Sequence, residues 1–289
     1  MRRRLVRLLL LLALAPSAQA TVGPGVSFDA VTALVAAAPV RTERYGADPL
    51  QSGELWLPAG AEPAPVVVLV HGGCWLNAYG ADHARPLAAA LAGEGFAVWS
   101  VEYRRVGDPG GGWPGTGHDV LAGIAQLARL AETAPLDLGR VALVGHSAGG
   151  HLALWAGGAL PDEAPVQPAA IVGLAAITDP VAYARGSNSC ETATPRFLGG
   201  LPEAVPDAYR DATPRPGHRP TVLLHGGADT IVAPVQARTF AAAAARAGAT
   251  VEVLELPGFG HFDLIHPGTD AFPVLTGTLR RLLAPVSAE

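Results

Sequence analysis

Residues 141–151 read VALVGHSAGGH, so an apolar run leads directly into a Gly-x-Ser-x-Gly motif. The run predicts a buried strand, and the residues that follow the motif, Leu152–Ala156, predict a helix. A strand that turns sharply into a helix through this motif is the nucleophile-elbow pattern, which lifts the serine hydroxyl above the edge of a sheet. We therefore predict that Ser147 is a nucleophile; the alternative is an ordinary serine in a glycine-rich loop.

A nucleophilic serine needs a base to accept its proton and an acid to orient that base. On this scaffold the acid and then the histidine follow the serine along the chain. Asp229 stands just after the apolar run 221–225, and His261 stands just after the run 251–256. Because ligands bind at the carboxyl ends of parallel strands, where Ser147 also lies, we expect Asp229 as acid and His261 as base.

Other residues compete for these two roles. Asp263, two residues after His261, is the reserve acid, and Asp179 is a weaker one. The alternative for Asp229 is an aspartate that caps a turn, and the alternative for His261 is a surface-loop histidine. The reserve bases are His146, His151, His225 and His266.

A second glycine-rich loop, HGGCW at 71–75, follows another apolar strand. Glycines at this place free backbone N–H groups to converge on the oxyanion that develops during acyl transfer. We assign the oxyanion hole to the N–H groups of Ala148 and Gly73, with Cys74 as the alternative donor. His71 is expected to brace the loop rather than to move protons.

These motifs resemble the α/β-hydrolase superfamily, and more narrowly its branch of kynurenine formamidase-like enzymes, small carboxylesterases and feruloyl-esterase-like proteins. The resemblance spans about residues 48–285 and implies a mostly parallel sheet of about eight strands, covered by helices on both faces. It also implies a Ser-His-Asp hydrolase. Cys74 departs from the family, in which a bulky residue is common, and this puts in doubt any substrate contact made there. The matching motifs are HGGCW (71–75), EYRR (102–105), WPGTGHDV (113–120), GHSAGGH (145–151), HGGADTIV (225–232) and GFGHFD (258–263).

Strand-like and helix-like segments alternate along most of the chain, which predicts an α/β fold with a parallel, helix-covered sheet. Residues 21–289 are long enough for one domain with a sizeable core. The stretch 180–218 breaks the alternation and is rich in Pro and Gly. We interpret it as a small cap-like insertion anchored by residues 197–200; the alternative is an ordinary surface excursion.

Residues 1–20 have a basic head, a short apolar stretch and an Ala-x-Ala site, the pattern of a secretory signal peptide. The alternative is an uncleaved anchor.

Removing this segment takes the formal net charge from −5 to −9, because it carries four arginines and no acids. An acidic chain without a basic patch argues against nucleic acid or an anionic membrane as partner. No later segment is long and apolar enough to span a bilayer. We expect an exported protein, secreted or periplasmic.

The chain has two cysteines, Cys74 and Cys190. In an oxidising compartment such a pair favours a disulfide, which would tie the irregular stretch to the catalytic rim. The alternative is two separate thiols. No Cys/His spacing indicates a zinc site, and we expect neither a metal nor a cofactor.

Four aromatic residues stand nearest to the motifs, and together they would suit an aryl or short apolar acyl group; the alternative is that they pack in the core or rim. We predict a serine hydrolase that cleaves small or aryl carboxylic esters through an acyl-enzyme. The alternatives are an arylformamidase acting on N-formyl-kynurenine-type amides, and a peptidase or polyester hydrolase. A non-enzymatic binding module is disfavoured by the complete set of candidate groups. The oligomeric state stays open. The four aromatic residues are Trp75, Tyr103, Trp113 and Phe262.

Overall fold

The computed structural model describes residues 25–285, so the predicted signal peptide at residues 1–20 lies outside the described residues. Eight strands form one sheet in the order β1-β2-β4-β3-β5-β6-β7-β8. Only β2 pairs antiparallel, with β1 and β4, and all other neighbours are parallel. The predicted α/β architecture is thus confirmed. The strands are β1 (Arg41–Arg44), β2 (Ser52–Trp56), β3 (Ala64–Val70), β4 (Ala97–Val101), β5 (Leu136–His146), β6 (Ala170–Leu174), β7 (Thr221–Gly226) and β8 (Val251–Leu256).

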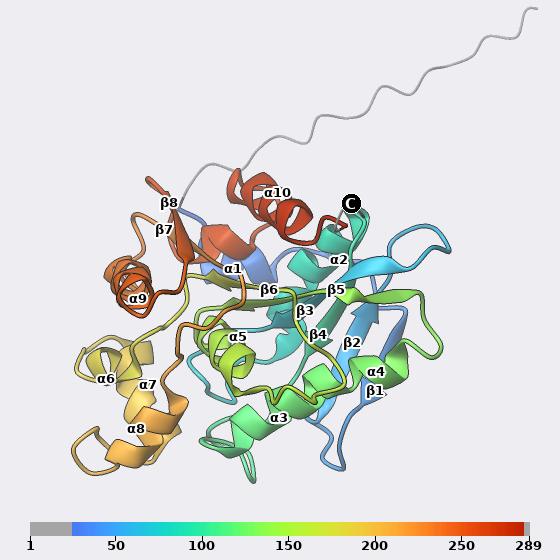
Figure 1. The fold of residues 1–289 in the computed structure, drawn as a ribbon. Coiled ribbons are helices and arrows are strands. Elements are labelled where there is room, and N and C mark those ends of the chain that lie inside the picture. The colour runs from blue at the N-terminus through green and yellow to red at the C-terminus, as the bar shows by residue number, and fades with distance from the viewer. Residues whose placement is uncertain (1–24, 286–289) are drawn as a thin grey trace, which may run out of the picture.

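Helices cover both faces of this sheet (Figure 1). Two 3-10 turns, η1 (Ala81–Ala84) and η2 (Phe262–Ile265), lie in the connections after β3 and β8. The α-helices are α1 (Phe28–Thr32), α2 (Arg85–Gly93), α3 (Gly115–Ala125), α4 (Leu127–Leu130), α5 (Ala148–Ala159), α6 (Pro180–Tyr183), α7 (Ser189–Leu198), α8 (Pro206–Ala212), α9 (Val235–Arg246) and α10 (Ala271–Leu282).

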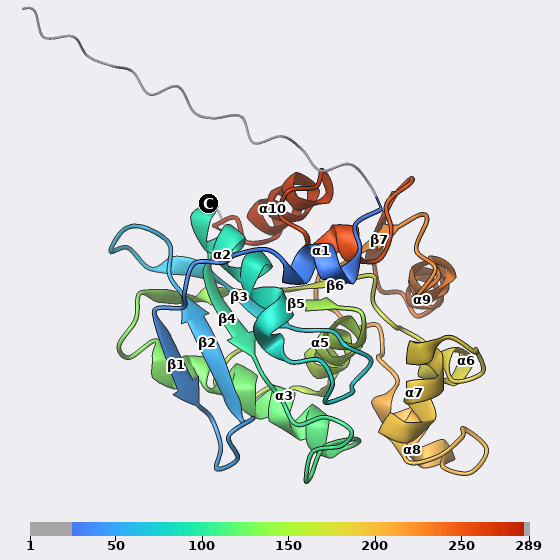
Figure 2. The same ribbon diagram turned by 180° about the vertical axis from the view of Figure 1, so that it is seen from behind.

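The central strands are apolar throughout because each of their two faces meets its own helix layer. Along β3, Val66, Val68 and Val70 belong to one hydrophobic cluster, whereas Val67 and Leu69 belong to the other. The first cluster packs under α3, α5 and α9, and the second packs under α2 and α10 (Figures 1 and 2). The period of two along a strand therefore accounts for the layered core.

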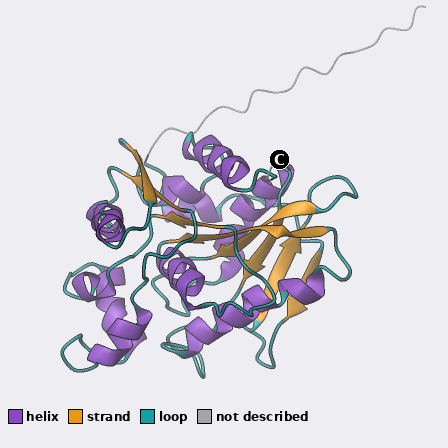
Figure 3. Cartoon of the chain, in the orientation of Figure 1, coloured by secondary structure: helices purple, strands orange, loops and turns teal. Residues whose placement is uncertain are grey.

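Residues 180–218, predicted as a cap-like insertion, contain the helices α6, α7 and α8 (Figure 3). Asn188 caps α7: its side chain accepts from the backbone N–H of Glu191, whose side chain accepts from the N–H of Asn188. Phe197 and Leu198 at the end of α7 are buried, as expected of an anchor. The segment is therefore mainly helical, although its Pro and Gly content favours a loop.

Several boundaries differ from those that the sequence predicts. The edge strand β1 reads Arg-Thr-Glu-Arg and alternates between half-buried and exposed positions, so no apolar run marks it. Strand β5 begins at Leu136, well before Arg140, because its first residues pair with Ala64 and Pro65 of β3. Helix α3 starts at Gly115, inside residues 106–117, where two prolines and six glycines would by themselves favour a loop.

The turn from β5 into α5 is crowded by backbone. A Cβ atom added at Gly149 would overlap the carbonyl oxygens of Val70 and His71, and one at Gly145 would overlap the carbonyl of Gly149. Only glycine lets α5 begin this close to the end of β3. The elbow glycines are therefore a packing requirement.

We expect Gly149→Ala to destabilise the fold by about 1–3 kcal/mol, because rigid backbone has to move to admit the methyl group. Gly277→Ala is the matched control, since a Cβ there meets open space within helix α10. It should stabilise the fold by about 0.4–1 kcal/mol through the entropy of the unfolded chain. Urea denaturation of both variants measures the difference, and equal midpoints would contradict this account.

Candidate active site

Ser147 occupies a strained turn between β5 and α5, with φ 57° and ψ −120°. Positive φ is unfavourable for a residue with a Cβ and marks functional sites when the surroundings enforce it. Here the Ser147 N–H donates to the carbonyl of Leu174, and its own carbonyl accepts from His151 (3.0 Å) and Ile177 (3.4 Å). The serine that the motif singles out is thus held by its backbone on two sides, and it is almost fully buried.

Asp229 and His261 meet at the carboxyl ends of β7 and β8. The Nδ1 atom of His261 donates to Oδ2 of Asp229 at 2.7 Å. The other carboxylate oxygen accepts the N–H groups of Ile231 (2.8 Å) and Val232 (2.9 Å). Asp229 therefore combines the two roles that the sequence left as alternatives, since one oxygen caps its turn and the other holds the imidazole.

Asp229 is suited to stay ionised in this position. Burial by itself raises its pKa, but the hydrogen bond and charge of His261, together with the N–H groups of Val232 and Ile231, hold the pKa below its ordinary value. With Nδ1 of His261 occupied by the carboxylate, the ring has Nε2 left for another partner.

A cavity of about 140 Å³ contains both Ser147 and His261 in its wall. His146 lies between the two segments: its Nε2–H donates to the carbonyl of His261 at 3.1 Å, and the two rings lie 4.5 Å apart. His146 thus packs against the site, as its place in the sequence suggests. The lining residues are Phe28, Gly73, Cys74, Tyr79, His83, His146, Ser147, Ser189, Cys190, Ile231, His261 and Phe262.

The 71–75 loop runs directly beside the serine. A Cβ atom built on Gly72 would lie 3.2 Å from Cβ of Ser147. Gly73 and Cys74 both have positive φ, 111° and 53°. Within residues 25–285, the N–H groups of Gly73, Cys74 and Ala148 donate to no other protein group. All three predicted oxyanion donors are therefore available to a ligand.

His71 braces this loop, as expected. Its Nε2 bonds to Oε1 of Glu102 at 3.0 Å, and its Nδ1 bonds to the carbonyl of Gly72 at 2.7 Å. Glu102 also accepts the N–H of Tyr103 and lies 3.4 Å from the Arg105 guanidinium. Burial raises the pKa of Glu102, but the bonds and charges of His71 and Arg105 outweigh it and lower the pKa to about 2. The brace is thus anchored on a fixed negative charge.

The reserve acids are engaged elsewhere. The carboxylate of Asp263 accepts the N–H groups of Gly25, Val26 and Gly260, and Asp179 caps helix α6. Among the other reserve bases, each contact is also structural. Nε2 of His151 donates to the carbonyl of Ala212, and Nδ1 of His266 accepts the N–H of Gly268. Nε2 of His225 donates to the carbonyl of Val232 and lies 3.7 Å from Oδ2 of Asp229.

Of the four aromatic residues predicted to bind substrate, only Phe262 lines the cavity. Trp75 and Trp113 pack instead against Phe197 of α7, with ring centroids 4.7 and 6.0 Å apart. Tyr103 is fully buried and stacks on the bracing histidine. Trp75 and Tyr103 thus lie in the core and Trp113 is half-buried against α7, so the cavity supports only Phe262 as a substrate contact. Proximity to a motif in sequence does not give the direction of a side chain, and burying large rings is favourable.

Five lining residues were not predicted from the sequence. Tyr79 and His83 follow the 71–75 loop closely, but that position alone is a weak signal, since Trp75 lies within the loop and is buried in the core. Phe28, Ser189 and Ile231 carry no comparable signal, because they come from α1, from the first residue of α7 and from the turn after Asp229.

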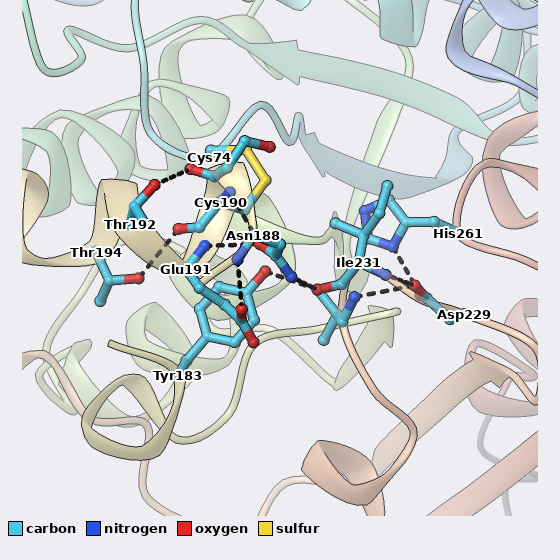
Figure 4. The surroundings of a disulfide bond; sticks show 12 residues. Cys74, Tyr183, Asn188, Cys190, Glu191, Thr192, Thr194, Asp229, Ile231 and His261 are labelled. Atoms are coloured by element: carbon cyan, nitrogen blue, oxygen red, sulfur yellow. Dashed lines mark hydrogen bonds and ion pairs between the residues drawn. A yellow bond between two sulfur atoms is a disulfide. The ribbon is translucent and has the colours of Figure 1, made fainter. Parts of the chain in front are cut away.

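Cys74 and Cys190 form a disulfide between residues 116 positions apart, with their Cα atoms 4.9 Å from each other (Figure 4). It joins the 71–75 loop to the first turn of α7. The same turn reaches the acid, because the side-chain amide of Asn188 donates to the carbonyl of Ile231 at 2.9 Å. Helix α7 therefore connects the loop after β3 with the turn that holds Asp229.

Neither a metal centre nor a membrane helix is found in the described part of the chain. Residues 25–285 contain no group of three or more His, Cys, Asp or Glu side chains placed to hold a metal ion. Among their helices, none has the combination of length and apolarity that crossing a bilayer requires.

The fold and the site define an α/β hydrolase. A family model described as BD-FAE matches residues 54–243, and the chain belongs to this family. Two curated relatives come from Mycobacterium tuberculosis. Esterase LipC is 31% identical over 251 residues, covering 76% of this chain and 59% of the relative. Esterase LipQ is 30% identical over 217 residues, covering 70% and 51%. The chain thus spans between half and three fifths of the length of these relatives.

The solved structures are similar in fold. Esterase B from Lactobacillus Rhamnosis aligns with a TM-score of 0.73 at 21% sequence identity, over 88% of this chain and 89% of that one. At this level of identity the likeness supports the architecture, as predicted from the motifs, and leaves the substrate open.

Replacing Cys74 and Cys190 together by serine should destabilise the protein by about 2–4 kcal/mol, since the bond closes a long loop. The loosened oxyanion loop should also lower kcat on p-nitrophenyl acetate more than it raises KM. Thr192→Ala, an exposed position of the same helix, is the control. Thermal unfolding and steady-state kinetics check both parts. Unchanged stability in the double variant would show that the bond is dispensable.

Proposed function

We propose that this protein is a serine hydrolase that cleaves carboxylic esters of small or aryl substrates. The observation that carries the proposal is the His261–Asp229 pair in a cavity whose wall also contains the strained Ser147. The names of the relatives, esterases LipC and LipQ, support the same reaction class.

In the proposed first step, Nε2 of His261 takes the proton of Ser147 as Oγ attacks the ester carbonyl carbon. The carbonyl oxygen gains the negative charge, and the N–H groups of Ala148 and Gly73, with Cys74 as alternative, stabilise it. One such donor is worth roughly 10²–10³ in turnover. The bond from carbon to the alcohol oxygen then breaks, and His261 gives its proton to the leaving alkoxide.

In the second step, water attacks the acyl-enzyme while His261 accepts its proton, and the returning proton releases the carboxylic acid from Ser147. Asp229 keeps the imidazole in the tautomer with Nδ1–H and stabilises the imidazolium. Its two bonds to the turn fix the carboxylate for this task. The mechanism uses only groups of this chain and water.

The cavity supports a small substrate group. Its volume of about 140 Å³ suits a short acyl chain or a single ring better than an extended polymer, which favours an esterase over a peptidase or a polyester hydrolase. An N-formyl amide would fit the same machinery, so arylformamidase activity stays in the substrate panel as the alternative.

We also propose that the protein is exported. The pattern of residues 1–20 supports a secretory signal peptide. The Cys74–Cys190 disulfide supports it independently, because such bonds persist in oxidising compartments and are rare in the cytosol.

Ser147→Ala should abolish hydrolysis of p-nitrophenyl acetate while the protein stays folded, because the attacking oxygen is lost. Steady-state assays and circular dichroism measure the two properties, and a fluorophosphonate probe should label wild type at Ser147 and leave the variant unlabelled. Retained turnover in the variant would overturn the assignment of the nucleophile.

Asp229→Asn should lower kcat by roughly 10⁴, because the amide favours the wrong imidazole tautomer. Asp179→Asn is the matched control, since that carboxylate caps α6 and does not contact His261. The two variants are compared by kcat at pH 7. If Asp263→Asn lost more activity than Asp229→Asn, the acid would have to be reassigned.

A further inference from the structure

The segment that precedes the core supplies part of the cavity wall. Phe28, the first residue of α1, lines the cavity together with Ser147 and His261. This segment lies before residues 54–243, the region that the family model matches. Family membership therefore assigns it no role, and its contribution has to be argued from its contacts.

Phe28 is the centre of an aromatic wall. Its ring lies 5.6 Å from Tyr79, 5.5 Å from His83 and 5.4 Å from Phe262. Each of these three rings also lines the cavity. Tyr79 and His83 belong to the connection between β3 and α2, and Phe262 starts η2, so one side chain joins two segments that are far apart in the sequence. Ser189, Ile231 and the two disulfide cysteines line the same cavity.

Asp263 holds the segment before the core, at Gly25 and Val26, against the loop after β8 that contains His261, which we call the histidine loop. Its fully buried carboxylate accepts the N–H of Gly25 at 3.0 and 3.1 Å and that of Val26 at 3.3 Å. It accepts the N–H of Gly260, next to His261, at 2.6 Å. Three backbone donors around one charge make strong hydrogen bonds. The buried Val31 holds the other end of α1 in the core.

The wall is uncharged near neutral pH. His83 is 6% exposed, and burial, with His71 nearby, lowers its pKa to about 4. Its neutral ring stands beside the apolar ring of Phe28, which in turn contacts Phe262. Such a surface suits an uncharged, apolar or aromatic group and disfavours a charged one.

We propose that Phe28 is a specificity-determining residue, which closes the cavity on its aromatic side and limits the size of the substrate group bound there. Asp263 is its positioning residue. This inference rests on the proposed ester hydrolysis and deepens it, because it names the side chain that selects among esters.

The test uses the full-length protein with Phe28→Ala and Phe28→Trp, and Val35→Ala as control, since Val35 is 99% exposed. Values of kcat/KM are measured for p-nitrophenyl acetate, butyrate, octanoate and benzoate, and for methyl, benzyl and naphthyl acetates. Phe28→Ala should raise the ratio of kcat/KM for the bulkiest ester to kcat/KM for the smallest ester at least about 10-fold, either in the p-nitrophenyl series or in the acetate series. Methylene-sized changes in a pocket have effects of that order. Tryptophan should move the same ratio in the opposite direction.

Asp263→Asn gives a second readout. It should shift the ester ratio in the same direction as Phe28→Ala and should speed hydrogen exchange of the amides in residues 25–32. A purely structural role in the histidine loop would lower kcat for all esters equally and leave the ratio unchanged. Such a result would remove Asp263 from the proposal.

Ratios within about twofold of wild type in both series for both Phe28 variants would overturn the inference while leaving the proposed function intact. Failure of the proposed function appears separately, as absence of Ser147-dependent turnover in wild type. In that case ligand-observed NMR with benzyl alcohol still decides the matter. If Phe28→Ala weakens the binding of benzyl alcohol and Val35→Ala does not, the result supports Phe28 as part of the cavity wall. Equal binding of benzyl alcohol by the two variants contradicts that role.

Discussion

The contact between the start of α5 and the end of β3 is the constraint on which the site depends. Glycine at 149 lets the helix backbone approach the carbonyl oxygens of Val70 and His71 without a clash, and glycine at 145 leaves room for the carbonyl of Gly149. The same approach strains Ser147 and brings the loop after β3 alongside it. A single packing arrangement therefore sets both the candidate nucleophile and the candidate oxyanion donors.

Helix α7 extends this arrangement to the acid. Strands β3 and β7 are separated in the sheet by β5 and β6, so the loops at their carboxyl ends do not hold each other directly. The disulfide at Cys190 and the amide of Asn188 join one helical turn to both loops (Figure 4). The start of α7 is thus part of the framework of the candidate site and also lines its cavity, through Ser189 and Cys190.

The sequence predicts the fold and the meeting of Asp229 with His261, because apolar runs mark buried strands and parallel strands end at one edge of the sheet. It does not predict which aromatic rings reach the cavity, since Trp75 and Tyr103 stand beside motifs yet point into the core. Phe28 escapes notice because a five-residue helix carries no periodic signal. The roles of the site residues stay predictions for kinetics to test.

The hydrogen bonds by which Asp263 holds the N–H groups of Gly25 and Val26 have a practical consequence for handling the protein. An affinity tag fused immediately upstream of Gly25 would end at a residue whose own N–H is bound by Asp263, close to the candidate base His261. Tag residues at that point would disturb the hydrogen bonds between Asp263 and this segment. A purification tag is therefore better placed after helix α10, none of whose residues lines the cavity.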